Sequence, residues 1–316
     1  MQTTPRDSGR LELELLHQFT ISTAYTLATE NEIRDMWRIL VPQVGFSTDY
    51  IMEGIFALAA VHMARYNADR RDLLLSHAAE YHTASLAKAL PLLSAVTPQN
   101  CSHLFLFGVL TLFYSLARPR QAGDMLLVGN GIVPEWLYLF RGMYPLREAD
   151  SSIHQSPVAL IFQTTEPSYD FWVSHSPEEN EALAELERKL RSNSMHDPIK
   201  LKALGGAIDG LKRSFTFLYG YKDVHFKDED RFRGFYTWIF EIDREYLKLL
   251  KDTDSEALCV LAFYTVLLKD LDKYWWMEGW AVHILQRIYT LLDGTYRLWI
   301  RWPIEQVGWV PDRVVL

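Results

Sequence analysis

The sequence predicts an all-α fold, a single domain of about a dozen helices around an apolar pocket. Apolar residues recur at three- and four-residue steps almost throughout, and no stretch alternates apolar and polar side chains long enough to suggest a strand. Of the 316 residues, 49% are apolar and 23% are charged, which is typical of a globular chain with a large core. These three observations together predict the fold class.

The first ten residues show no such periodicity, and we expect a disordered tail over 1–10 before a helical domain over 11–316. Helical spacing begins at Leu11, Leu15 and Phe19, and it returns between Ile51 and His62. Ser47-Thr48-Asp49 before the second run is a helix N-cap signal.

The longest apolar run covers residues 104–117 and reads LFLFGVLTLFYSLA. A bilayer requires roughly twenty such residues, so this run predicts a fully buried helix and no membrane span. Thr97-Pro98 precedes it as a start signal.

The middle of the chain is more broken. Gly129-Asn130-Gly131 predicts a turn, and residues 164–180 predict a long loop. Residues 178–193 are highly charged, with three leucines as apolar anchors, so this segment is predicted to be an exposed or mobile helix. Further on, helical spacing covers 235–249, and Asp254-Ser255-Glu256 is an N-cap signal before 257–271.

Charge and cysteine content exclude several classes of protein. Forty acidic residues against 32 basic ones give a net charge of −8, which opposes attraction to phosphates, so we expect no direct nucleic acid binding. Cys101 and Cys259 are too few for a zinc cluster or a disulfide framework, and we expect no metal and no cofactor. The N-terminus shows no secretory signal, which leaves the cytoplasm or the nucleus.

Tryptophan is concentrated near the C-terminus, where residues 275–309 hold six of the ten. Such density indicates a packed cap on an apolar interior, and we expect that interior to hold a hydrophobic small molecule. The exposed end of the domain leaves a homodimer open, because apolar residues assigned to the core could equally serve association.

Four polar residues fall on apolar helix faces: His62, Glu241, Glu278 and His283. A buried carboxyl keeps its proton, which acid catalysis on an epoxide requires. Buried carboxyls and imidazoles are also commonly satisfied structural groups, so both roles stay open for each residue.

Several motifs carry a resemblance to a known family when they are read in order. The segments that carry it include Trp37-Arg38, residues 57–65, Thr97-Pro98-Gln99-Asn100-Cys101, residues 257–262, residues 276–280, Trp302-Pro303 and Gly308-Trp309. Over residues 11–312 the chain resembles the C-terminal regulatory domain of fungal binuclear-zinc-cluster transcription factors, in the branch of the sterol-uptake regulators. The resemblance implies an all-α domain that binds a sterol-like ligand.

The chain departs from that family in lacking the six-cysteine DNA-binding module. Stand-alone copies of the domain are similar to proteins of fungal secondary metabolism, including the epoxide-rearrangement proteins of quinolone-alkaloid pathways. The resemblance therefore implies a cofactor-independent isomerase that rearranges an epoxide. The alternative is a transcriptional regulator that senses a sterol-like ligand and has lost its DNA-binding module, and it would be nuclear.

For the isomerase, the sequence assigns a role to each of six residues. Glu241 and Glu278 are the candidate proton donors, and Glu241 is the more diagnostic because it departs from the family pattern. His283 would orient a donor through a hydrogen bond. The walls that stabilise a cation are Tyr274, Trp275 and Trp280.

Overall fold

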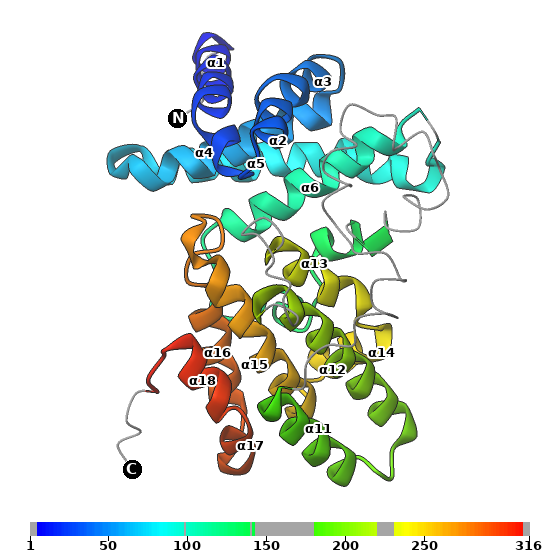
Figure 1. Cartoon of the computed structure of the whole chain (residues 1–316). Coiled ribbons are helices and arrows are strands. Elements are labelled where there is room, and N and C mark those ends of the chain that lie inside the picture. Colours follow the sequence, from blue (N-terminus) through cyan, green and yellow to red (C-terminus); the bar gives the residue numbers. More distant parts are fainter. Residues whose placement is uncertain (1–4, 98, 140, 143–179, 220–230, 312–316) are drawn as a thin grey trace. The chain divides into compact units, whose positions relative to one another are not determined.

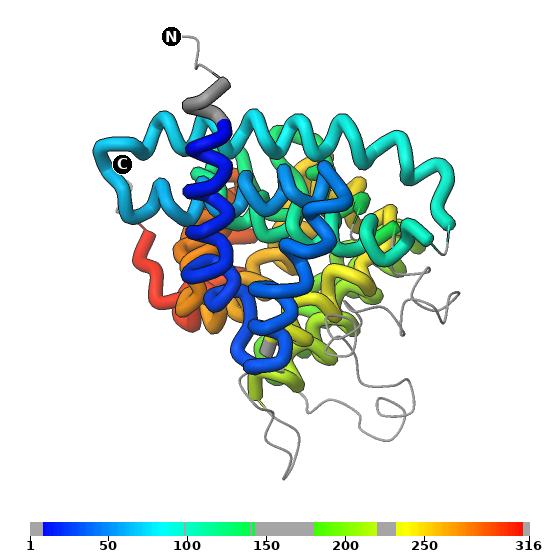
Figure 2. The backbone as a smooth tube through the Cα atoms, turned by 90° about the horizontal axis from the view of Figure 1, so that it is seen from above, coloured from blue at the N-terminus to red at the C-terminus, as the bar shows by residue number. Residues whose placement is uncertain are grey.

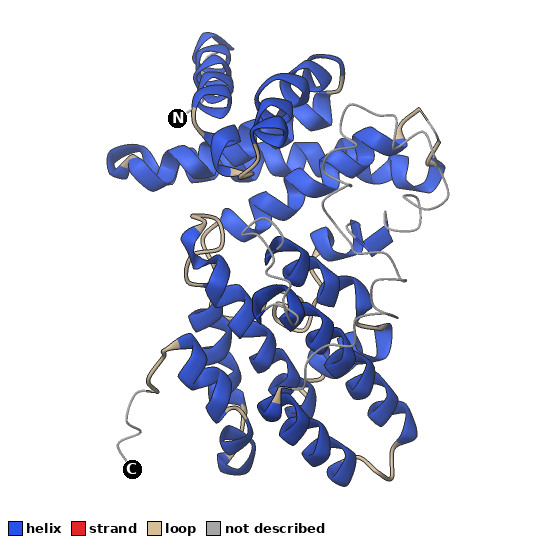
Figure 3. Ribbon diagram, in the orientation of Figure 1, coloured by secondary structure: helices blue, strands red, loops and turns tan. Residues whose placement is uncertain are grey.

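The computed structural model describes residues 5–97, 99–139, 141–142, 180–219 and 231–311. In these ranges the chain forms fourteen α-helices joined by short turns, and Figure 3 shows no strand among them. The predicted all-α class is confirmed. The loop predicted over 164–180 lies outside the described residues except for Asn180.

The contacts of the chain gather into two compact units. Unit 1 comprises Met1–Pro119 and Glu135–Gln163, and unit 2 comprises Arg120–Pro134 and Thr164–Leu316. The single domain over 11–316 stays a prediction. None of the described helices is both long enough and apolar enough to cross a bilayer.

Unit 1 is built around helix α4, and most residues of this helix are buried. The helices of the unit can be followed in Figures 1 and 2. Its helices are α1 (Pro5–Ile21), α2 (Asn31–Asp35), α3 (Val41–Ser47), α4 (Asp49–Tyr66), α5 (Arg71–Ala89) and α6 (Cys101–Ala117). Helix α4 packs against α1, α3, α5 and α6. Helix α4 can pack on several faces because the run FALAA, residues 56–60, has small or apolar side chains all around the helix.

Two sequence predictions concern unit 1. Helix α6 buries thirteen of its seventeen residues, as the apolar run predicts. Helix α1 begins at Pro5, so residues 5–10 are helical where the sequence predicted a disordered tail. Proline suits the first turn of a helix, where its missing N–H has no intrahelical partner in any case.

Unit 2 is built around helix α15, which buries every residue from Glu256 to Leu268. Its helices are α11 (Glu181–Asn193), α12 (Pro198–Tyr219), α13 (Arg231–Glu241), α14 (Arg244–Lys251), α15 (Ser255–Asp270), α16 (Trp280–Leu291), α17 (Gly294–Trp299) and α18 (Arg301–Val307). Helix α15 contacts all seven other helices of the unit, most extensively α16 and α12 (Figure 1).

Local signals of the sequence position these elements. The side chain of Asp254 accepts hydrogen bonds of 3.0 Å from the backbone N–H groups of Glu256 and Ala257, which confirms the predicted cap of α15. Asn130 and Gly131 have positive φ angles of 50° and 76°, as the predicted turn requires. Helix α11 buries Leu183, Leu186 and Leu190, the three anchors of the charged segment.

Candidate functional site

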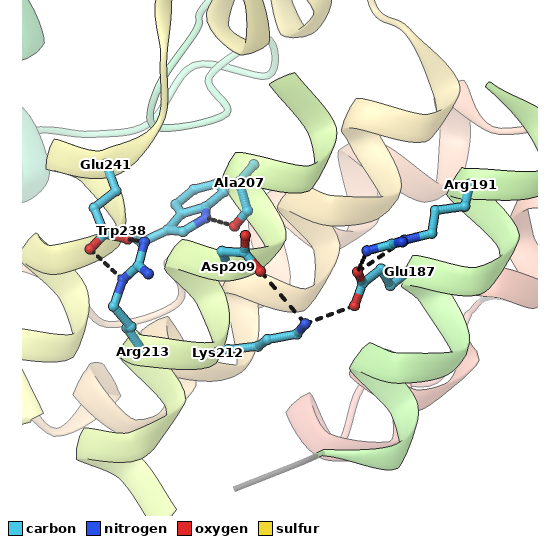
Figure 4. Close-up of polar contacts among 8 residues, drawn as sticks. All are labelled: Glu187, Arg191, Ala207, Asp209, Lys212, Arg213, Trp238 and Glu241. Carbon is cyan, nitrogen blue, oxygen red and sulfur yellow. Dashed lines mark hydrogen bonds and ion pairs between the residues drawn. The ribbon is translucent and has the colours of Figure 1, made fainter. Parts of the chain in front are cut away.

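Glu241, the first candidate proton donor, is the last residue of α13 and pairs with Arg213 of α12 (Figure 4). The Arg213 Nε and Nη2 donate to the two carboxylate oxygens of Glu241, each over 2.6 Å. The Glu241 side chain is 25% exposed. A guanidinium at this distance favours the charged carboxylate. The structure therefore places Glu241 in a partly exposed ion pair, where the sequence left a buried acid and a solvated side chain both open.

The contact between α12 and α13 is close because Gly210 has no side chain. A Cβ at Gly210 would lie 2.7 Å from Oε2 of Glu241 and 3.1 Å from Cδ1 of Trp238. Trp238 is fully buried, and its Nε1 donates to the carbonyl of Ala207 over 2.8 Å (Figure 4). This hydrogen bond fixes the indole against α12 and supplies the partner that a buried tryptophan needs.

Glu278, the second candidate donor, lies in the turn before α16 and is exposed. Its backbone carbonyl accepts a 2.7 Å hydrogen bond from Nη1 of Arg120. The following residue, Gly279, has a φ of 80°, a conformation that glycine adopts without strain. Exposure of the Glu278 side chain differs from the predicted burial, because the turn directs this position away from the core.

His283 lies on α16, half-buried, with its ring 5.9 Å from that of Trp280 in an edge-on arrangement. Burial lowers the pKa of His283 below its ordinary value, and the positive charge of Arg120 lowers it further. The Arg120 guanidinium lies 5.4 Å from the Trp280 ring. Arg120, Trp280 and His283 thus form one cationic and aromatic group.

Tyr274 belongs to a different aromatic cluster. It stacks on Trp276 with centroids 5.5 Å apart, and Phe232 packs on both rings at 4.6 and 5.5 Å. Phe232 is at the start of α13 and Glu241 at its end, so about 14 Å of helix separates them at 1.5 Å per residue. Trp275 lies between Tyr274 and Trp276 in the sequence, and its side chain is half-buried. The structure therefore does not gather the six predicted residues around one point. Glu241 lies at the end of α13, and Tyr274 packs against the start of this helix.

An apolar groove that the sequence analysis missed lies between α11 and α12. Its volume is about 470 Å³. The lining residues are Glu187, Leu190, Arg191, Pro198, Leu201, Lys202, Gly205 and Ile208. The predicted pocket was expected near the tryptophan-rich C-terminus, and this groove uses other helices. The signal that could have revealed it is Gly205-Gly206 within an otherwise regular helical pattern.

Charged side chains connect the two helices of the groove (Figure 4). The Lys212 Nζ lies 2.7 Å from Oε2 of Glu187 and 3.6 Å from Oδ1 of Asp209. Arg191 reaches the other oxygen of Glu187 at 2.5 Å. The hydrogen bond from Lys212 is the main reason that the pKa of Glu187 is lowered. Two cations, Lys212 and Arg191, thus pair with two carboxylates, Glu187 and Asp209, beside the groove.

Sequence reasoning also missed Glu256, an acidic residue at the start of α15. Its side chain is buried, at 2% exposed. Its Oε2 accepts from the Ser194 hydroxyl and pairs with Lys200 Nζ at 2.7 Å. Lys200 also pairs with Asp254 at 2.6 Å. Among the described residues, no three His, Cys, Asp or Glu side chains are grouped to hold a metal ion. Through Lys200, the Glu256 cluster connects α12 to the start of α15.

Comparison with known proteins finds that the chain is similar to two fungal transcription factors. No protein-family model matches the chain. In an alignment of 312 positions that covers 93% of this chain, it is 25% identical to a Zn(2)-C6 fungal-type transcription factor of Gibberella zeae. Over 151 residues, 47% of its length, it is 28% identical to the Zn(2)-C6 fungal-type transcription factor afumD of Aspergillus fumigatus.

The matches cover 61% and 39% of these two relatives, so the chain spans less than two thirds of either one. Both relatives fit the resemblance to a zinc-cluster regulator that the sequence motifs indicate. The likeness to stand-alone epoxide-rearrangement proteins stays a prediction. The chain is thus similar to a large part of two fungal transcription factors.

Proposed function

We propose that this chain is the regulatory region of a fungal transcriptional regulator of the Zn(2)-C6 type, and that it acts in the nucleus. The observation that carries the proposal is the similarity to the Gibberella zeae factor over 93% of the chain. A match of that extent includes the helices of both units. The proposal therefore concerns the whole fold and does not depend on one motif.

The charge and composition of the chain support a regulatory role in which another module contacts the DNA. The net charge of −8 opposes phosphate binding, and two cysteines cannot supply six zinc-binding thiolates. DNA recognition would then come from a module outside these 316 residues, in the same polypeptide or in a partner. This chain would contribute contacts with proteins or with a small molecule.

A sterol-like ligand is the finer part of the resemblance, and it stays a prediction. The groove between α11 and α12 has an apolar floor, but the side chains of Arg191 and Lys202 are exposed beside it. Pockets that enclose an apolar small molecule bury most of its surface. The open and charged character of this groove supports a macromolecular partner more than a sterol.

The epoxide isomerase also stays a prediction. Its two proton donors are a carboxylate paired with Arg213 and an exposed Glu278. The guanidinium of Arg213 favours the charged form of Glu241 over the neutral acid that would open an epoxide. The purified chain offers a direct comparison: turnover of an epoxidised prenyl-alkaloid without added cofactor would support the enzyme over the regulator.

A reporter assay tests the regulatory proposal. Residues 5–311 are fused to a heterologous DNA-binding domain in a fungal host, and transcription from a promoter with the matching sites is measured. We expect transcription to change several-fold relative to the DNA-binding domain alone. An unchanged reporter, with the fusion folded and present in the nucleus, would refute the proposal. The chain without the DNA-binding domain is the control and should leave the reporter unchanged.

A further inference from the structure

Helix α12 consists of two parts that are separated by the adjacent glycines Gly205 and Gly206. Glycine is the least favourable residue in a helix after proline, and sharp bends of helices occur at pairs of such small residues. A Cβ at either position would meet no atom within 4 Å. Packing therefore requires neither glycine, whereas Gly210 is explained by the close approach of Trp238.

The part of α12 before the two glycines contributes little to the core. In Pro198–Leu204 only Ala203 and Leu204 are buried, and Ile199 is 68% exposed. In Ala207–Phe217, by contrast, eight of the eleven residues are buried. Segments with few buried apolar residues open at a lower free energy than the rest of a fold.

The side chain of Lys200 connects this first part of α12 to the start of α15. Its Nζ lies 2.6 Å from Oδ2 of Asp254 and 2.7 Å from Oε2 of Glu256. Ser194, in the turn that precedes α12, donates a hydrogen bond to the same oxygen of Glu256. Polar contacts with two acidic side chains thus hold the turn and the first part of α12 against α15.

The second part of α12 has its own partners on α13. The Trp238 Nε1 donates to the carbonyl of Ala207 over 2.8 Å, and Arg213 pairs with Glu241 at 2.6 Å. Both contacts lie beyond the two glycines. Release of the first part from α15 would therefore leave the packing of the second part in place.

Glu256 offsets part of the cost of such a release. Its side chain is 2% exposed, and among the described residues no group donates a hydrogen bond to its Oε1. A buried carboxylate oxygen without a donor is unfavourable. Release would expose this oxygen to water, and its hydration would compensate in part for the lost ion pair.

We propose that residues 194–204 form a releasable segment, which bends away from α15 at Gly205-Gly206. In the closed form, which the structure shows, Lys200 holds the segment against Asp254 and Glu256. In the open form these two carboxylates face water, while α12 beyond the glycines stays packed on α13. The segment is a conformational device of unit 2 with one polar contact point and one hinge.

Amide hydrogen exchange of the full 316-residue chain, followed by mass spectrometry of overlapping peptides, tests the proposal. The amides of residues 202–208, whose hydrogen bonds lie at the hinge, are compared with those of residues 212–217. We expect the first group to be protected at least about tenfold less. Its exchange should also be insensitive to urea below the unfolding transition, because a local opening exposes little surface. Equal protection of the two groups would overturn the proposal.

Two substitutions that each break an ion pair of α12 distinguish local release from global unfolding. Lys200→Met removes the contact that release breaks, so we expect exchange at residues 202–208 to become at least about tenfold faster. Arg213→Met breaks a pair that stays formed during release, so it should change this exchange less than about twofold. Equal effects of the two variants would show that these amides exchange through global unfolding, and the proposal would fail.

The hinge is tested by the double variant Gly205→Ala with Gly206→Ala, which should fold because neither Cβ meets an atom within 4 Å. We expect exchange at residues 202–208 to slow at least about tenfold, since alanine favours the straight helix. Gly294→Ala, at the start of α17, also meets open space and is the control that should leave this exchange unchanged. An unchanged rate in the double variant would overturn the proposal, even if Lys200→Met did not fold.

This inference does not depend on the proposed function. Hydrogen exchange is measured on the purified chain and transcription in cells, so either result can fail while the other stands.

Discussion

Arg213 of α12 binds Glu241 of α13 through two hydrogen bonds of 2.6 Å, which joins helices across 28 positions of sequence. Both side chains are partly exposed, at 31% and 25%. The paired geometry holds the carboxylate in its charged form. The structure therefore gives Glu241 a two-point partner on α12, and its catalytic role stays a prediction.

Glu241→Gln removes the negative charge but keeps the shape of the side chain. We expect a loss of about 1 kcal/mol in the free energy of unfolding, modest because the pair is partly solvated. Urea unfolding measures this loss, and a double-mutant cycle with Arg213→Met isolates the coupling between the two residues. A coupling energy of zero would show that the pair contributes nothing to the fold.

Two glycines of α12 should respond oppositely to alanine. Gly210→Ala would push a methyl group against Trp238, which is buried and hydrogen-bonded, so we expect a loss of about 1–2 kcal/mol. Gly205→Ala meets open space and gains helix propensity, so we expect a gain of about 0.5–1 kcal/mol. Chemical unfolding of both variants checks the signs. A stabilised Gly210→Ala would show that the contact between α12 and α13 is loose.

The ion pair between Lys200 and Glu256 should be important for stability. Lys200→Met leaves the buried carboxylate of Glu256 without its cation, and we expect a loss of about 2–4 kcal/mol. Lys202→Met, two positions away and exposed, is the control and should change stability by less than about 0.5 kcal/mol. Thermal unfolding of both variants distinguishes the two positions. Equal Tm values would refute the role of Lys200.

Two histidines of unit 1, the buried His62 and the half-buried His82, should make stability depend on pH. Burial lowers the pKa of His62 and of His82 to about 4, from 6.5. Because the unfolded chain binds the proton more readily, their contribution is complete above pH 6.5 and is lost as the pH falls toward 4. We expect each to remove on the order of 1–2 kcal/mol between pH 7 and pH 5.

His82→Phe isolates one of these contributions, because phenylalanine retains the stacking of His82 on Tyr114, at 4.0 Å between centroids, without a titrating group. The free energy of unfolding of this variant should fall less steeply between pH 7 and pH 5 than that of the parent chain. Parallel curves would show that His82 titrates alike in the folded and unfolded states.

Arg120 should influence the titration of His283. Its charge is the second cause, after burial, of the lowered pKa of His283. Arg120→Met removes that charge, so we expect the pKa to rise while burial keeps it below the ordinary value. Imidazole NMR signals followed against pH measure it, with His283→Gln to assign the resonance. An unchanged pKa would show that Arg120 does not act on His283.

Helical periodicity predicted the fold class, a continuous apolar run predicted the burial of α6, and an N-cap signal predicted the cap of α15 by Asp254. These features depend on residues close in sequence, so a short window contains the information. Such local patterns did not predict the contacts of the candidate site residues. Glu241, for example, adjoined an apolar stripe and could be either buried or solvated until its neighbour was known.

The sequence by itself determined that this acidic chain of few cysteines is helical. Only the tertiary structure decided that Glu241 meets Arg213 and that Gly205 opens a groove between α11 and α12. The physical reason is that partners of a side chain come from helices distant in sequence. Their crossing is set by packing over the whole core, which periodicity along one helix does not record.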